Sequence, residues 1–374
     1  METTTGFVWN ERYMWHDNGS ALGELPSGGN FQPGIHLENP ETKRRLKNLL
    51  DAYAVTPQLV SLPHELASRE HLERFHTSDY VDRVEAMSKT SGGFVGQSCW
   101  AGPGSYDIAR LAVGGTYSAM EAVAKGHVSN AYALTRPPGH HAERDRGRGF
   151  CIFNNIGLAV LAARANHLVD RVAIVDWDVH HGNGTQQAFY DDPDVLTISI
   201  HQEMLYPVNL GKITEIGDGK GTGLNLNIPL PAGTGGAAYL KAMDEIVSPA
   251  LQAFKPDLIM VACGFDAAYF DPLSHMLLIA NHFRAMTDKI KRLAEDLCDG
   301  RLVLNHEGGY SDFYVPLCGL AVIEAISGID TGVKDPYAGT EFVANQDLYP
   351  HQDHRLREII TGPLATLLKH QSSI

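Results

Sequence analysis

The chain has 374 residues, of which 44% are hydrophobic and 20% are charged, a globular composition sufficient for one large α/β domain or two smaller ones. Its formal charge of −14, with no polybasic run, argues against nucleic-acid or anionic-membrane partners. The chain has no signal-like N-terminus, no membrane-spanning stretch and no CxxC pair among its five cysteines. We therefore expect a reducing, cytoplasmic location without a disulfide framework or a thiolate zinc site.

The first third of the chain is expected to be mainly helical. Residues 1–40 are rich in aromatic residues, Gly, Pro and His and have no clear period, which indicates irregular structure folded onto the body. A Gly/Ser-rich segment at 91–105 predicts a loop. Apolar spacing of helical period predicts helices at 41–55, 66–87 and 106–125.

The basic residues, the isolated histidines and two glycines in this part of the chain can also be interpreted. The basic run from Lys43 to Lys47 is interpreted as a solvated helix face, and the isolated histidines, such as His16 and His76, as surface groups. Two glycines lie inside the helix at 106–125, where glycine destabilises. We infer that Gly114 and Gly115 allow close packing against a neighbour.

From residue 130 onward, apolar strands alternate with helical stretches, of which 237–254 and 280–298 are the clearest. This alternation is typical of βαβ units and predicts an α/β fold with a mainly parallel sheet and helices on both faces. No repeat or linker divides the chain, so we predict a single domain over residues 1–374. The expected strands are 130–135, 172–176, 195–200, 224–228, 257–263 and 301–305.

The strand at 172–176 leads directly into a row of polar residues. Asp176, Asp178 and His180 alternate along the chain and would point the same way from an extended backbone. Charged side chains are almost never buried without a partner or a metal. A salt-bridged strand end capped by the Gly-rich turn remains an alternative, but the row favours a metal site.

Other predicted strands also end in polar residues. His140 and His141 follow 130–135, Ser199 to His201 end 195–200, Asp266 follows 257–263, and Tyr310 follows 301–305. Ligands of open α/β sheets bind outside the carboxyl ends of the strands. Five strand ends therefore deliver His, Asp and Tyr to one edge.

These residue types suit metal-assisted hydrolysis of an amide. A catalytic zinc ion takes three N or O ligands from the protein, and Asp178, His180 and Asp266 supply such a set. The adjacent His140 and His141 can accept a proton from water and return it to a leaving group.

Three further residues complete this chemistry. Asp176 and Asn183 are candidates for orienting the imidazoles by hydrogen bonds. Tyr310, on a Gly-rich loop, can donate a hydrogen bond to a developing oxyanion, although a packing role explains a lone tyrosine equally well. Cys151 has no paired base and is interpreted as a small buried residue.

Six ordered motifs resemble the zinc-dependent histone deacetylase family. The likeness is closest to its bacterial class II-like branch, the histone deacetylase-like amidohydrolases, with acetylpolyamine amidohydrolases as near relatives. The motifs are RPPGHHA (136–142), GFCIFNN (149–155), DWDVHHGNGT (176–185), GFDA (264–267), DPL (271–273) and EGGY (307–310).

The resemblance implies an arginase-like α/β fold with a central eight-stranded parallel sheet. It assigns zinc to Asp178, His180 and Asp266. It makes His141 the general base and acid, His140 an electrostatic aid and Tyr310 the oxyanion donor.

The resemblance also implies monovalent cations and a substrate tunnel. A structural potassium ion would be held by Asp176, Asp178, His180, Ser199 and the carbonyl of Ile200. A second cation would lie around Phe189, Asp192 and Val195. The acyl-lysine tunnel would be lined by Phe150, Tyr206 and Leu273, with Gly149 and Gly308.

Two positions bear on the branch and the substrate. Asn183 stands where class I members have Asp, which supports the class II-like assignment. Leu273 stands where polyamine-selective relatives can carry an acidic residue, so a cationic polyamine would find no counter-charge there. The loop 202–212 also lacks the usual Pro-Gly-Thr-Gly run.

We therefore expect a zinc-dependent amidohydrolase that removes acyl groups from an acetylated lysine peptide or a small acetylated amine. Acetylpolyamine deacetylation is an alternative, since the acidic surface attracts cations. A catalytically silent acyl-ligand binding protein is an alternative of another class. A two-manganese arginase-type hydrolase is disfavoured because no bridging carboxylates are evident. Bacterial relatives often self-associate, so a homo-oligomer is also expected.

Overall fold

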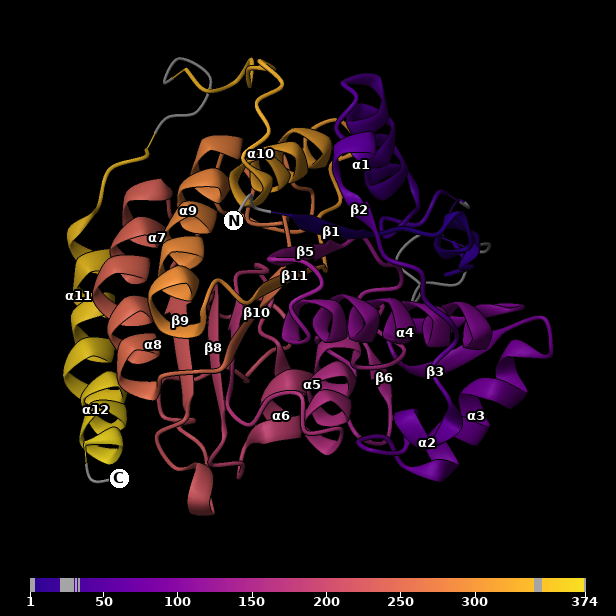
Figure 1. Ribbon diagram of the computed structural model, residues 1–374, viewed down its shortest axis with the longest axis horizontal. Coiled ribbons are helices and arrows are strands. Elements are labelled where there is room, and N and C mark those ends of the chain that lie inside the picture. Colours follow the sequence, from indigo (N-terminus) through magenta and orange to yellow (C-terminus); the bar gives the residue numbers. More distant parts are fainter. Residues whose placement is uncertain (1–3, 21–29, 31, 33, 340–344, 373–374) are drawn as a thin grey trace.

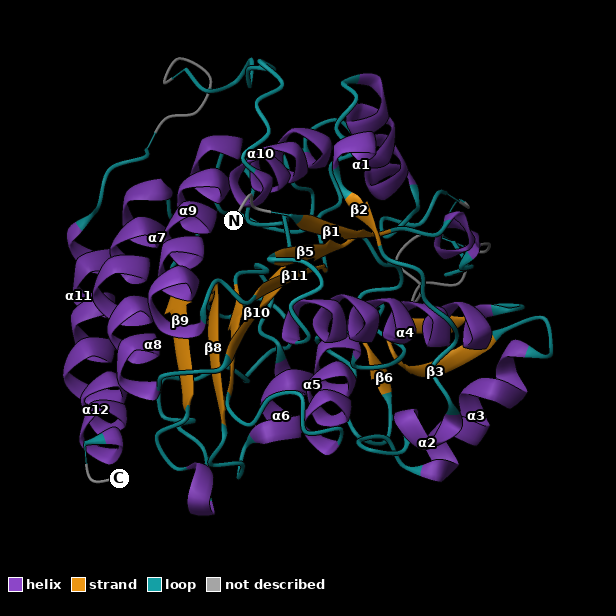
Figure 2. Ribbon diagram, viewed as in Figure 1, coloured by secondary structure: helices purple, strands orange, loops and turns teal. Residues whose placement is uncertain are grey.

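A sheet of eight parallel strands forms the centre of the computed structural model, which describes residues 4–20, 30, 32, 34–339 and 345–372 (Figure 2). The strand order is β2-β1-β5-β11-β10-β7-β8-β9, and every neighbouring pair is parallel. The strands are β1 (Thr5–Val8), β2 (Val60–Ser61), β5 (Asn130–Ala133), β7 (Val172–Asp176), β8 (Val195–Gln202), β9 (Asn225–Leu230), β10 (Leu258–Cys263) and β11 (Leu302–His306).

The apolar runs of the inner strands follow from burial on both faces. In β7, Val172 and Ile174 join one hydrophobic cluster, whereas Ala173 and Val175 join the other. Because side chains alternate along a strand, both alternate sets must then be apolar. The predicted parallel sheet is confirmed, and all six predicted strands are present.

Helices cover both faces of the sheet, as the βαβ alternation predicts. They are α1 (Glu41–Ala52), α2 (Arg69–Leu72), α3 (Ser78–Ser88), α4 (Ser105–Ala124), α5 (Asn155–Ala165), α6 (Asn183–Phe189), α7 (Gly236–Ala242), α8 (Ser248–Phe254), α9 (Ala280–Cys298), α10 (Val315–Ser327), α11 (Pro350–Ile359) and α12 (Ala365–Gln371). Helices α4, α5 and α6 pack on one face, and α1 and α7 to α12 on the other (Figure 1). In the part of the chain described here, no helix combines the length and apolar character needed to cross a membrane.

Two predictions in the N-terminal third are wrong. The segment 66–87 is two helices, α2 and α3, because the intervening residues bond elsewhere: Thr77 N–H donates to the Arg144 carbonyl at 2.9 Å. The expected loop at 91–105 contains β3 (Gly93–Gln97) and β4 (Cys99–Ala101), which form a second sheet with β6 (Gly147–Arg148). The segment was predicted as a loop because it is rich in Gly, and its strands are too short to show an apolar pattern.

The expectation of irregular structure over residues 1–40 is partly wrong. Residues 5–8 form β1, which lies between β2 and β5 in the central sheet. A strand of four residues is too short to give a readable alternation. Residues 1–3, 21–29, 31 and 33 of this segment lie outside the described residues.

Three groups interpreted as exposed are in fact buried. Lys43 is fully buried in an ion pair with Glu38 at 3.3 Å. His16 is buried with its Nδ1 at 2.8 Å from Ser105 Oγ, and His76 is buried with its Nδ1 at 3.0 Å from the Glu143 carbonyl. The partners of His16 and His76 are 89 and 67 positions away in sequence, and Glu38 precedes the predicted helix that contains Lys43, so the helical pattern did not indicate these contacts.

The glycine pair in α4 is packed closely, as predicted. A Cβ atom at Gly114 would lie 1.8 Å from the Glu65 carbonyl oxygen, and one at Gly115 would lie 2.4 Å from the Tyr13 hydroxyl. The first neighbour is backbone and cannot swing aside. The chain of residues 65–67 therefore crosses α4 only because position 114 has no side chain.

Gly114→Ala should lower the free energy of unfolding by about 1–3 kcal/mol, because overpacking outweighs the higher helix propensity of Ala. Urea titration followed by circular dichroism measures this. Gly362→Ala is the matched control, since it also lies in a helical stretch and a Cβ there meets nothing within 4 Å. Equal stabilities for Gly114→Ala and the control would contradict the packing argument.

Candidate active site

The polar residues singled out in the sequence lie at the carboxyl edge of the central sheet. β7 ends at Asp176, and the loops after β5, β8, β10 and β11 surround it. Because all these strands are parallel, their carboxyl ends meet at one edge. The site is therefore assembled from segments that are far apart in sequence.

Asp178, His180 and Asp266 form a compact, buried set of donors. One donor atom from each residue lies within 4.8 Å of the others. His180 Nδ1 is 3.1 Å from Asp178 Oδ1 and 3.0 Å from Asp266 Oδ2. Two backbone amides hold the remaining oxygens: Val179 N–H donates to Asp266 at 2.7 Å, and Gly308 N–H donates to Asp178 at 2.8 Å.

Two buried carboxylates and an imidazole lie in contact in this set. Burial and the neighbouring Asp178 charge raise the pKa of Asp266 to about 6. Burial lowers the pKa of His180, but its hydrogen bonds to Asp178 and Asp266 outweigh this and raise it to about 10. Two carboxylates and one imidazole fit a divalent ion such as zinc, which neutralises the excess negative charge.

The two adjacent histidines have unequal partners. His140 Nδ1 lies 2.9 Å from the Asp176 carboxylate, whereas His141 Nδ1 lies 2.8 Å from the Asn183 amide oxygen. Burial lowers the pKa of His140, but Asp178 and Asp176 outweigh it and raise this pKa to about 10. Burial and the charges of His140 and His180 hold the pKa of His141 well below its usual value. The pair thus combines a cation with a neutral base.

Tyr310 is buried on the loop that follows β11. Its N–H donates to the Asp271 carboxylate at 2.7 Å, and its ring meets Phe150 edge-on with 5.8 Å between centroids. Burial and the charges of Asp266 and Asp178 raise the pKa of Tyr310 well above its usual value. The hydroxyl therefore keeps its proton and serves as a hydrogen-bond donor.

A pocket of about 200 Å³ leads to these residues. Of the five residues expected in the tunnel, Phe150, Tyr206, Leu273 and Gly149 line it. Gly308 instead lies beside the donor set, where a Cβ would be 2.2 Å from Asp266 Oδ2. The full lining is Ser98, His141, Gly149, Phe150, His180, Leu205, Tyr206, Leu273 and Tyr310. Ser98 and Leu205 were not foreseen, since neither belongs to a motif.

Three of the five residues expected around potassium lie side by side in the sheet, and Asp178 and His180 lie in the loop after β7. Asp176 pairs with Ser199 across β7 and β8, and Ile200 is the next residue of β8. Ser199 Oγ lies 3.0 Å from His201 Nδ1. In the second predicted set, the carboxylate of Asp192 is engaged by Arg164.

Three further acids also contact site residues, although the sequence analysis assigned no role to them: Glu307, Asp271 and Glu143. Glu307 accepts hydrogen bonds from the N–H groups of Gly139 at 2.6 Å and His140 at 3.2 Å, so it anchors the loop that carries His140 and His141. Burial raises the pKa of Glu307 to about 7. Its position just after β11 was the available signal, since acids at strand ends are rarely left unpaired.

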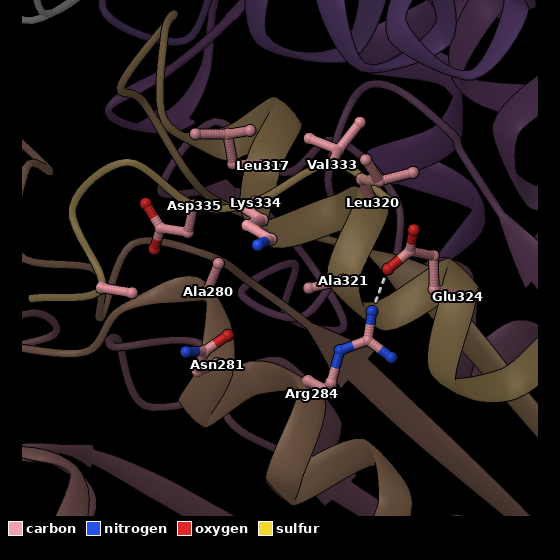
Figure 3. Close-up of a pocket in the computed structure, with 11 residues that line it drawn as sticks. Ala280, Asn281, Arg284, Leu317, Leu320, Ala321, Glu324, Val333, Lys334 and Asp335 are labelled. Atoms are coloured by element: carbon pink, nitrogen blue, oxygen red, sulfur yellow. Dashed lines mark hydrogen bonds and ion pairs between the residues drawn. The ribbon is translucent and has the colours of Figure 1, made fainter. Parts of the chain in front are cut away.

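A larger hollow, of about 310 Å³, lies between α9 and α10 and contains none of the predicted site residues (Figure 3). Arg284 of α9 and Glu324 of α10 form an ion pair at its wall. It has no histidine, so the chemistry described above belongs to the smaller pocket at the sheet edge.

Comparison with known proteins agrees with this geometry. A family model of the histone deacetylase domain matches residues 36–326. The chain is 50% identical over 339 residues to a histone deacetylase-like amidohydrolase of Pseudomonas aeruginosa, covering 90% of this chain and 89% of the relative. It is 38% identical to a probable deacetylase of Archaeoglobus fulgidus, covering 89% of each.

A solved structure shows the same fold. The crystal structure of the HDA15 HD domain matches with a TM-score of 0.85 at 30% identity, covering 99% of this chain and 98% of that one. The resemblance inferred from the six motifs and the predicted fold are thus confirmed. The chain belongs to the histone deacetylase family and is accordingly a hydrolase of the deacetylase or amidohydrolase type.

Proposed function

We propose that this protein is a zinc-dependent deacylase that removes acetyl groups from lysine-like amines, with residues 1–374 forming one catalytic domain. The observation that carries the proposal is that His141, His180 and Tyr310 line one pocket, with Asp178 and Asp266 in contact with His180 and with His140 adjacent to His141. When bound by Asp178, His180 and Asp266, zinc supplies Lewis acidity toward the acyl oxygen and lowers the pKa of water.

The side chains around the metal then have separate roles. His141 accepts a proton from the attacking water at Nε2, because its Nδ1 is engaged by Asn183. His140 stays positively charged beside Asp176 and stabilises negative charge on the reacting groups. Tyr310 donates a hydrogen bond to the oxyanion of the tetrahedral intermediate. His141 finally returns its proton to the leaving amine.

The pocket wall favours an acyl-lysine over an acylated polyamine. Phe150, Tyr206 and Leu273 offer apolar surface to an alkyl stem. Leu273 gives a second ammonium group no counter-charge. The charge of −14 nevertheless steers cations toward the protein, so acetylpolyamine deacetylation remains the second candidate.

The proposal also includes monovalent cations, a cellular location and an oligomeric state. We propose a structural potassium ion at Asp176, Asp178, His180, Ser199 and Ile200, with a second site around Phe189, Asp192 and Val195 left as an expectation. A cytoplasmic location and a homo-oligomeric state also remain proposals. A silent acyl-binding protein is disfavoured, since it would need neither Tyr310 nor the His pair.

Metal removal tests the proposal most directly. Dialysis against a chelator should abolish hydrolysis of a fluorogenic acetyl-lysine peptide, and zinc should restore it. Asp178→Ala should lose both activity and stoichiometric zinc, measured by atomic emission. Asp296→Ala, an exposed position on α9, is the control and should keep both. Equal rates of peptide hydrolysis by wild type and Asp178→Ala would contradict the proposal.

Tyr310→Phe should lower kcat on the same peptide by about 10²–10³, the usual loss for one oxyanion donor. Zinc content should not change, because the hydroxyl is not one of the donors. Tyr269→Phe, at a tyrosine that is 40% exposed, is the control and should keep full kcat. An unchanged kcat in Tyr310→Phe would remove this residue from the mechanism.

Leu273→Glu should raise kcat/KM for acetylputrescine relative to kcat/KM for the acetyl-lysine peptide by about 2–5-fold. This change corresponds to the free energy of an exposed ion pair. Leu273→Gln controls for polarity without charge and should shift the ratio less. Wild type should prefer the peptide. Preference of the wild type for acetylputrescine would favour the second candidate function.

A further inference from the structure

A carboxylate lies directly behind the Asn183 amide that orients His141. Asn183 Oδ1 is 2.8 Å from His141 Nδ1, while its Nδ2 donates to Glu143 Oε1 at 2.8 Å and to the His141 carbonyl at 3.2 Å. All three residues are buried. The contacts form a continuous line from Glu143 through Asn183 to the imidazole.

The donor and acceptor groups of an amide determine which end of Asn183 faces His141. An ionised carboxylate only accepts hydrogen bonds, so the side of Asn183 that faces Glu143 must carry the NH₂ group. The reversed amide would set its oxygen against the carboxylate of Glu143 and the carbonyl of His141. Asn183 Oδ1 therefore faces His141, which places the imidazole proton on Nδ1 and leaves Nε2 free as a base.

The partner of His140 needs no additional residue to fix its orientation. Its partner Asp176 is a carboxylate, and either oxygen can accept the Nδ1 proton. An asparagine can present the wrong group after a rotation of 180°. The amide at position 183 thus needs a further group to fix its orientation, and Glu143 is an acceptor within hydrogen-bond distance of its NH₂ group.

Glu143 is itself held firmly. Arg148 Nη1 lies 2.7 Å from its Oε1, and Arg146 Nε lies 2.9 Å from its Oε2. Its backbone carbonyl accepts a hydrogen bond from His76 Nδ1 at 3.0 Å. The Arg148 guanidinium also lies over the ring of Tyr206 in the pocket wall, 5.7 Å from the centroid. These contacts fix the positions of both oxygens of the Glu143 carboxylate, which lies beside two arginines.

We propose that Glu143 is a positioning residue for deacylation, which fixes the amide of Asn183 and through it the tautomer of His141. This inference rests on the proposed function. It assigns to Glu143 an effect on the chemical step and not on substrate binding, because Glu143 is not one of the residues that line the pocket and its carboxylate contacts Asn183.

Glu143→Gln tests the inference, because a glutamine amide tolerates both orientations of Asn183. We expect kcat per bound zinc to fall about 10–100-fold, as for other groups that orient a catalytic side chain, with KM within about 2-fold. Glu324→Gln is the control, since Glu324 is a buried glutamate paired with an arginine far from the site. A wild-type kcat in Glu143→Gln would overturn the inference.

A charge-swapped double variant separates positioning from simple loss of packing. In Asn183→Asp either carboxylate oxygen accepts the His141 proton, but this variant alone sets two carboxylates against each other and should also be slow. In the double variant Glu143→Gln/Asn183→Asp, the residue beside His141 is a carboxylate and the residue behind it is an amide. Neither an amide in the wrong orientation beside His141 nor a pair of carboxylates remains, so we expect at least 10-fold higher kcat than in either single variant. A double variant whose loss equals the product of the single losses would overturn the inference.

A readout independent of turnover keeps this test distinct from that of the proposed function. In ¹⁵N NMR spectra of histidine-labelled protein, the His141 signals, assigned by their loss in His141→Asn, should show a protonated Nδ1 in wild type. Glu143→Gln should show a mixture of tautomers. A wild type without deacylase activity would overturn the proposed function alone, whereas unchanged tautomer signals in Glu143→Gln would overturn the role of Glu143.

Discussion

The structure depends on the burial of several carboxylates at one edge of a parallel sheet. Asp176, Asp178, Asp266 and Glu307 are each at most 3% exposed, and like charges in a medium of low dielectric repel strongly. Their compensation comes from loop backbone N–H groups, from imidazoles, and, in the proposed function, from a bound cation. The loops after β5, β7 and β11 supply the N–H groups and imidazoles, so the charge balance of the site depends on how these loops fold.

The two histidines show how this balance produces different chemistry from identical side chains. His140 faces carboxylates and is held as a cation, whereas His141 faces an amide and remains a neutral base. The difference is one atom in the partner, oxygen in Asp176 against nitrogen in Asn183. The surrounding charges then decide which imidazole exchanges protons during a reaction.

Much of the fold and of the site could be predicted, because their signals are local. Buried strands such as β7 show continuous apolar runs, and parallel strands bring Asp178 and Asp266 to a common edge. What was missed depends on partners distant in sequence. The burial of His16 depends on Ser105, 89 positions later, and the contact that gives Glu143 a role is made by Asn183, 40 positions later. The short strand β1 has too few residues for a periodic signal.

The buried guanidinium of Arg136 sets the limits of the folding unit. It donates to the carbonyls of Tyr13 at 3.2 Å and His16 at 2.9 Å, and pairs with Glu38. The match to the family begins at residue 36, so both carbonyl groups and all of β1 precede it. A fragment cut at residue 36 would remove both carbonyl acceptors of Arg136 Nη1, keep only the contacts with Glu38, and leave a gap between β2 and β5. The contacts that hold this edge of the sheet together therefore extend beyond the region that the family model matches.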